Sequence, residues 1–157
     1  MKLYLARHGE AVPKHINPDS PLSEEGRKEV EAVAMFLARG VIRFGQIRHS
    51  NKARARQTSE IFAKAMGGGA NIEAMKGLNP MDDPEPALEQ IMRFSEDILL
   101  VGHLPFMGRL VDLILAGSSA SGLVEFHTCT VVCLQKRNRS DWTLRWMLSP
   151  ELFTQDL

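Results

Sequence analysis

Two short apolar segments constrain the fold of this chain most strongly, because each leads into a histidine with a glycine beside it. Residues 2–6 run through an arginine into His8, and residues 98–101 run into His103. An apolar run of this length next to glycine is typical of a buried strand in a parallel sheet. The carboxyl ends of such strands form the edge at which open α/β sheets bind ligands. The sequence therefore predicts that both histidines lie at one such edge.

Length and charge narrow the class of protein further. The chain has 157 residues, of which 44% are hydrophobic and 24% charged, as in ordinary globular proteins. We expect a single domain over residues 1–157 with no large inserted cap. Nineteen Lys and Arg balance nineteen Asp and Glu, so there is no bulk positive field to attract nucleic acid or an anionic membrane. No apolar stretch approaches the ~20 residues of a membrane span. We therefore expect a cytoplasmic protein whose partners include neither nucleic acid nor membrane.

Cysteine usage predicts neither a disulfide nor a metal centre. The two cysteines, Cys129 and Cys133, are four positions apart in a segment with a strand pattern. They share a face of that strand but lie too far apart along an extended chain for a disulfide. No Cys-x-x-Cys pattern or paired histidine accompanies them, as a zinc site would require. We expect two packed, reduced thiols, with no metal and no cofactor.

The rest of the chain alternates helical and extended patterns. An apolar periodicity typical of a helix begins after Ser23, a good N-cap, and ends at Gly40. Together with the two apolar runs, this alternation predicts a three-layer α/β/α sandwich with a mostly parallel sheet and an antiparallel edge. Further helices are expected over residues 51–66, 87–94 and 105–117, and further strands over residues 46–50, 71–74, 123–127, 130–135 and 142–148.

The polar residues that follow the predicted strands suit phosphoryl transfer. Right-handed crossovers would bring Arg7, His8, Arg54 and His103 to one edge of the sheet. Each arginine can grip two phosphoryl oxygens with its planar fork. A neutral His8 can attack phosphorus to form a phosphohistidine that water later cleaves, and a protonated His103 near a helix N-terminus adds charge. An unperturbed imidazole pKa of ~6.5 predicts that activity falls at acid pH as His8 protonates.

Three motifs carry a resemblance to a known family. Residues 7–10, Arg-His-Gly-Glu after an N-terminal strand, resemble the signature of the histidine phosphatase superfamily, which includes phosphoglycerate mutases. Ser50, Arg54-Ala55 and Gln57-Thr58 resemble the second arginine motif of that superfamily, and Gly102-His103 its second histidine. The short chain and three further segments resemble the compact SixA-type protein phosphohistidine phosphatases: residues 21–23 with Gly26, residues 103–105, and residues 146–150.

The resemblance implies a phosphoglycerate mutase-like fold and a metal-independent mechanism. By analogy His8 is the nucleophile, and Arg7, Arg54 and His103 form the phosphate pocket. The SixA-type resemblance implies that the substrate is phosphohistidine on a partner protein, such as a phosphorelay or phosphotransfer carrier domain. Two alternatives stay open: a phosphatase for small phosphomonoesters of the same superfamily, and a catalytically silent phosphate-binding module.

The chain also departs from the pattern of these families. SixA-type relatives often carry arginine where Ser20 stands here. Broader members of the superfamily place an acidic proton donor in the segment that holds Asp82, Asp83 and Glu85. These three carboxylates are candidate donors, with solvated loop charges as the alternative. Glu10 is a fourth candidate, with a hydrogen-bonding role at the turn as its alternative.

Two basic residues are alternatives to Arg54 in the phosphate pocket, and three further histidines have no predicted role. Lys52 and Arg56 flank Arg54 and are alternatives for its role, although we expect both on the surface. His15, His49 and His127 have no partner by spacing. We expect them in a loop, on an exposed strand and on an edge strand, and we assign them no chemistry.

Overall fold

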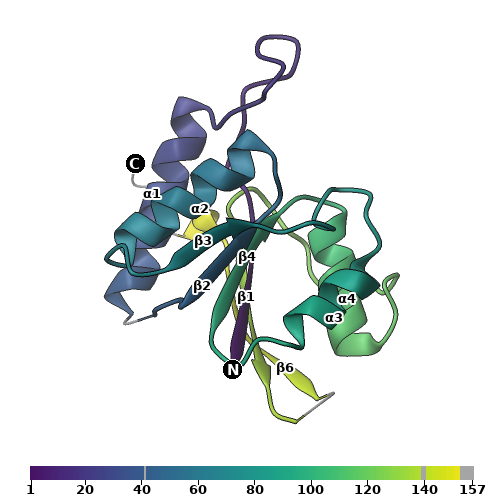
Figure 1. Cartoon of the computed structure of the whole chain (residues 1–157). Helices are drawn as coiled ribbons and strands as arrows, with labels where there is room; N and C mark the ends of the chain where they lie inside the picture. Colours follow the sequence, from purple (N-terminus) through teal and green to yellow (C-terminus); the bar gives the residue numbers. More distant parts are fainter. Residues whose placement is uncertain (41, 139–140, 153–157) are drawn as a thin grey trace.

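The computed structural model describes residues 1–40, 42–138 and 141–152. Its centre is a six-stranded sheet in the order β3-β2-β4-β1-β5-β6 (Figure 1). The strands are β1 (Lys2–Arg7), β2 (Gln46–His49), β3 (Asn71–Ala74), β4 (Ile98–Gly102), β5 (Val131–Lys136) and β6 (Trp142–Leu148). The helices are α1 (Glu24–Arg39), α2 (Ala53–Ala65), α3 (Pro84–Ile91) and α4 (Phe106–Ala116), followed by the short 3₁₀ helix η1 (Pro150–Leu152).

Strand pairing confirms the predicted sheet. β1 and β4 run parallel in the centre, and β2 and β3 extend the parallel half beyond β4. β5 and β6 add the antiparallel edge beside β1. The register sets Arg7 opposite Gly102, and His49 opposite Val101. Because the strands β1, β4 and β2 end level with one another, the residues that follow them meet at one edge.

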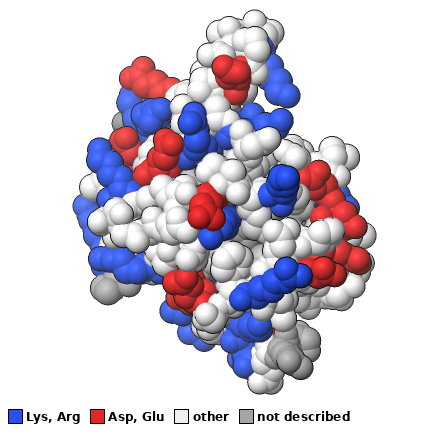
Figure 2. All heavy atoms as spheres, in the orientation of Figure 1, with Lys and Arg blue, Asp and Glu red and all other residues white. Residues whose placement is uncertain are grey.

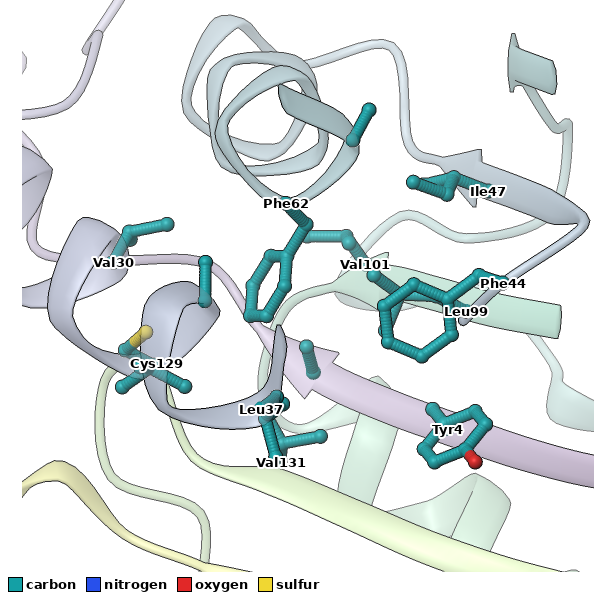
Figure 3. Close-up of a cluster of buried hydrophobic side chains, with 14 of the residues drawn as sticks. Tyr4, Val30, Leu37, Phe44, Ile47, Phe62, Leu99, Val101, Cys129 and Val131 are labelled. Atoms are coloured by element: carbon teal, nitrogen blue, oxygen red, sulfur yellow. The ribbon is translucent and has the colours of Figure 1, made fainter. Parts of the chain in front are cut away.

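Two hydrophobic layers hold helices to both faces of the sheet. In β1, Tyr4 belongs to the layer beneath α1 and α2, whereas Leu3 and Leu5 belong to the layer beneath α3 and α4. Successive side chains of a strand point to opposite faces, so a central strand with helices on both sides must be apolar throughout. Figure 3 shows the first layer, where Phe62 of α2 lies among strand residues such as Val101. The predicted three-layer sandwich is confirmed (Figure 1).

Capping residues set the helix ends. The Ser23 side chain accepts a hydrogen bond from the backbone N–H of Gly26, and α1 ends before Gly40, as predicted. The third helix begins at Pro84 rather than at residue 87, because Asp83 caps it and proline suits a first helical turn.

The strand predicted over residues 123–127 does not form. Asp112 of α4 is buried, and its carboxylate accepts the backbone N–H groups of Gly122 and Leu123. This contact attaches the segment to the helix, and β5 takes the sheet position beside β1 that another strand would need. Cys129 also lies outside a strand, in a turn with φ of 57°. Both it and Cys133 are buried free thiols in the layer beneath α1 and α2.

A loop of residues 8–23 joins β1 to α1 and projects beyond the sheet edge (Figure 1). An isolated bridge between Ala11 and Leu22 closes its base, and the Ser20 hydroxyl donates to the carbonyl of Val12. In the part of the chain that the structure describes, no helix is long and apolar enough to cross a membrane.

The base of this loop packs against α1 with no room for a side chain. A Cβ added at Gly26 would lie 2.1 Å from the carbonyl oxygen of Glu10. We predict that Gly26→Ala lowers the free energy of unfolding by about 2 kcal/mol, because the overlap outweighs the ~1 kcal/mol helix preference of alanine over glycine. Chemical denaturation measures this. Gly69→Ala is the matched control, since a Cβ there meets nothing within 4 Å. Equal stabilities of the two variants would contradict the prediction.

Candidate active site

The two histidines predicted to meet at the sheet edge do meet. His8 follows β1 and His103 follows β4, and the backbone N–H of His8 donates to the carbonyl of Gly102 at 3.0 Å. The centroids of the two imidazole rings are 4.8 Å apart. Parallel pairing of β1 with β4 therefore places both imidazoles side by side.

The first turn of α2 brings Arg54 to the same place. Its guanidinium Nε donates to Nε2 of His8 at 3.2 Å. Lys52 is the N-cap residue of α2, without a capping hydrogen bond from its side chain. Nε of Arg56 lies 3.9 Å from a carboxylate oxygen of Glu60, and both side chains are more than half exposed. Of the three neighbouring cations, Arg54 is the one that contacts a histidine of the site.

Arg7 reaches the site from the end of β1. Its Nη1 donates to the carbonyl of Phe126 at 2.9 Å, while its Nε is buried without a hydrogen-bond partner among the described residues. Burial lowers the pKa of Arg7 and that of Arg54. Guanidinium groups nevertheless stay charged in proteins because their pKa lies so far above neutrality. The site therefore holds two fixed positive charges.

The tautomer of His8 follows from its two hydrogen bonds. Nδ1 lies 2.7 Å from the carbonyl oxygen of Gly9, which only accepts, so Nδ1 carries the proton. Nε2 then keeps its lone pair, which faces the N–H of Arg54. The pKa of His8 is lowered to about 4, chiefly by burial; the hydrogen bond to the Gly9 carbonyl raises it, and the charges of Arg54 and Arg7 lower it. The expected protonation near pH 6.5 is thus wrong for this environment.

His103 is also held neutral. Its Nε2 lies 2.5 Å from the Ser50 hydroxyl, and its Nδ1 is buried with no partner in the described part of the chain. Burial lowers the pKa of His103 to about 3, with smaller contributions from His8, Arg54, Lys52 and Arg7. The protonated form of His103, which would add charge to the site, is therefore not the form that this environment favours. A bound anion would raise the pKa of both histidines, because negative charge stabilises an imidazolium.

Two residues that the sequence analysis gave no role hold the site in shape. The Thr58 hydroxyl accepts from the backbone N–H of Gly9 and donates to the carbonyl of Arg54. The Gln57 side chain accepts from the backbone N–H of Leu22. These bonds tie the loop after β1 to the first turns of α2. The signal for their role in the sequence was their place in the second arginine motif, after Arg54-Ala55 and Arg56.

Three of the four carboxylates considered as proton donors take part in hydrogen bonds with nearby residues. Glu10 lies within hydrogen-bond distance of the Ser23 hydroxyl, Asp82 accepts from the backbone of Asn79, and Asp83 caps α3. Glu85 is exposed on the first turn of α3. None of the four is a hydrogen-bond partner of His8 or His103 within the described ranges.

The remaining histidines differ in burial. His15 and His127 are exposed, His15 in the projecting loop as expected and His127 in a loop instead of an edge strand. His49 was expected to be exposed, but it is buried at the end of β2. It shares its face of the strand with the core residue Ile47, and its Nδ1 lies 2.6 Å from the carbonyl of Ser50. The two-residue spacing from Ile47 was the signal for its burial.

A cleft of about 560 Å³ adjoins the histidine pair on the side of Arg54. The projecting loop, the first turns of α2 and the ends of β2 and β3 form its walls. Its lining residues are Lys14, Pro18, Asp19, His49, Asn51, Lys52, Ala53, Arg54, Arg56 and Ala74. Among the described residues, no group of three His, Cys, Asp or Glu side chains is placed to hold a metal ion.

Paired imidazoles and guanidinium groups at the carboxyl end of a parallel sheet are chemically suited to binding an oxyanion. Residues 3–82 match the family model of the histidine phosphatase superfamily (branch 1). The chain is also 32% identical over 130 residues to an uncharacterized protein of Picosynechococcus sp. (strain ATCC 27264 / PCC 7002 / PR-6), covering 78% of each. This chain therefore belongs to the histidine phosphatase superfamily.

Solved structures confirm the phosphoglycerate mutase-like fold. The protein histidine phosphatase SixA in complex with tungstate is 22% identical, with a TM-score of 0.88 over 98% of this chain and 100% of that one. A candidate phosphohistidine phosphatase SixA from Agrobacterium tumefaciens is 28% identical, with a TM-score of 0.78 over 95% and 97%. A mycobacterial glucosyl-3-phosphoglycerate phosphatase is 16% identical, with a TM-score of 0.73 over 92% and 97%. Family and neighbours together support a phosphatase.

The lowered pKa values predict how stability depends on pH. The unfolded chain takes up protons at His8 and His103 near pH 6.5, whereas the folded chain does so only near pH 4 and pH 3. We expect the free energy of unfolding to fall as the pH drops below about 6.5, by up to ~1.4 kcal/mol per pH unit for each histidine. Denaturation between pH 5 and pH 7.5 measures this. The variant His8→Asn/His103→Asn should show a flatter dependence, and an unchanged slope would contradict the assignment.

Proposed function

We propose that this chain is a metal-independent phosphatase that removes the phosphoryl group from phosphohistidine on a partner protein, with His8 as the nucleophile. The observation that carries the proposal is the unprotonated Nε2 of His8, whose lone pair accepts a hydrogen bond from the guanidinium of Arg54. The lowered pKa keeps this lone pair available at neutral pH. A neutral imidazole beside fixed positive charge is what attack on a phosphoryl group requires.

The first step forms a covalent phosphohistidine on the enzyme. Nε2 of His8 attacks phosphorus, and the bond from phosphorus to the substrate's imidazole nitrogen breaks on the opposite side. Arg7 and Arg54 hold the equatorial oxygens with their N–H groups. The other ring nitrogen of the substrate's imidazole takes a proton from water, so the imidazole departs neutral when the bond breaks. Such a leaving group needs a weaker acid than an alkoxide does.

The second step regenerates the enzyme. Water attacks the phosphorus on His8, the bond from phosphorus to Nε2 breaks, and inorganic phosphate leaves. His103 lies beside His8, so it contacts the same phosphoryl oxygens, and its rise in pKa next to the anion lets it donate a hydrogen bond there. The imidazole of His8 returns to the tautomer with its proton on Nδ1, facing Gly9.

Openness of the site supports a protein substrate. The longest connections between described elements are residues 8–23 and 117–130, and we propose a single domain with no cap over the histidines. A side chain presented by another protein has access to such a site. The likeness to SixA-type phosphohistidine phosphatases supports the same substrate.

The second candidate function is hydrolysis of small phosphomonoesters. The likeness to a mycobacterial glucosyl-3-phosphoglycerate phosphatase favours it. An ester needs a proton donor for its alkoxide leaving group. Glu10, Asp82, Asp83 and Glu85 are the candidates for that role, and each would have to move from its local setting or act through water.

A comparison of substrates tests the proposal. We expect hydrolysis of a phosphohistidine peptide to exceed that of sugar and nucleotide phosphates by at least tenfold in kcat/KM. His8→Ala should reduce turnover by ~10⁴-fold or more, because it removes the covalent nucleophile. Faster hydrolysis of the esters would establish the second candidate function. Binding of the phosphopeptide without turnover would establish a silent recognition module.

The two neighbouring arginines of α2 form a matched pair for testing the phosphate pocket. With phosphoramidate as the probe, Arg54→Ala should lower kcat/KM by about 10²- to 10³-fold, because it removes a charged donor from the transferring phosphoryl group. Arg56→Ala should change it less than twofold, since Arg56 faces Glu60 instead of His8. The reverse order would assign the role to Arg56.

A further inference from the structure

The cleft beside Arg54 carries a local excess of positive charge. Four cations line it, namely Lys14, Lys52, Arg54 and Arg56, against the single carboxylate of Asp19 among its described lining residues. The whole chain has equal numbers of positive and negative side chains, so this excess is local. Figure 2 shows Lys and Arg side chains beside and below the projecting loop.

Most of this charge is free to meet a ligand. Lys14 and Lys52 take part in no ion pair within the described residues. Arg56 has only a long contact to Glu60, with both side chains more than half exposed. Exposed pairs of this kind contribute little and exchange readily with another partner.

The cleft is continuous with the catalytic histidines through one side chain. Arg54 lines the cleft and also donates to His8, so a group bound at His8 lies at the inner end of the cleft. Lys14 on the projecting loop and Arg56 on α2 stand on different walls. A molecule whose phosphoryl group reaches His8 and which extends into the cleft therefore lies between these cations.

We propose that this cleft binds acidic side chains that flank the phosphohistidine on the surface of the partner protein, an inference that rests on the proposed function. Carboxylates that flank the phosphohistidine and enter the cleft come within the ~10 Å screening length of its cations at ordinary ionic strength. Nucleic acid fits less well, because it requires a long basic track that a chain of balanced charge does not offer. Complementary charge of this kind governs association and partner choice more than the chemical step.

Two synthetic phosphohistidine peptides of equal length test the proposal. One carries Glu and Asp around the phosphohistidine, and the other carries Gln and Asn at the same positions. At low salt we expect the unmodified enzyme to hydrolyse the acidic peptide with a kcat/KM about tenfold higher, through KM, and to lose this preference at 0.5 M salt, where the screening length falls toward 3 Å.

Variants in which a cation is replaced by glutamine show which residues cause the preference for the acidic peptide. Lys14→Gln/Arg56→Gln should remove the preference for the acidic peptide, whereas Lys64→Gln, on the last turn of α2 away from the cleft, should keep it. All three proteins should hydrolyse phosphoramidate at the same rate, which shows that they are folded and that the catalytic residues are intact.

Each contrary result has a separate meaning. Equal hydrolysis of the two peptides by the unmodified enzyme would overturn the cleft proposal and leave the proposed function standing. A preference that survives in the Lys14→Gln/Arg56→Gln variant would also overturn it, since recognition would then lie elsewhere. Hydrolysis of phosphoramidate with neither peptide turned over would overturn both proposals.

Discussion

Parallel pairing of β1 with β4 is the constraint on which the site depends. The register sets Arg7 opposite Gly102, and the hydrogen bond from the His8 backbone to the Gly102 carbonyl continues that ladder one residue past the strand. Both imidazoles therefore leave the sheet at the same level. Because the strands are buried on both faces by separate hydrophobic layers, a shift in register would expose core residues to the wrong face. The packing of the core thus fixes the distance between the histidines.

The same burial determines the charge state of the site. Two guanidinium groups surround two imidazoles whose pKa values are lowered, so the positive charge is carried by the groups that cannot lose it. Cations held together in a partly buried place repel one another, and an oxyanion relieves that repulsion. In the proposed mechanism a phosphoryl group enters a site already arranged for it, and His8 stays unprotonated as the nucleophile.

Elements with strong local signals were predicted well. The two apolar strands, the caps of α1 and the order of the helices and of the strands other than residues 123–127 agree with the structure, because each depends on a few neighbouring residues. The strand predicted over residues 123–127 was wrong. The backbone at the start of this segment donates hydrogen bonds to the Asp112 carboxylate, and the alternation of apolar and polar residues carries no information about that contact. The prediction that His49 is exposed was wrong, because His49 follows Ile47 by two residues and so shares its buried face of β2. The roles of Gln57 and Thr58 depend on a loop more than thirty residues away.

Residue chemistry and local order along the chain were sufficient to identify the histidines, the arginines and the sheet edge where they lie. Tertiary structure decided that Arg54 faces Nε2 of His8, that Ser50 faces His103, and that a basic cleft opens beside Arg54. The physical reason is distance in sequence. Strand and helix patterns arise between near neighbours, whereas these contacts, the lowered pKa values and the cleft arise from segments that only the folded chain brings together.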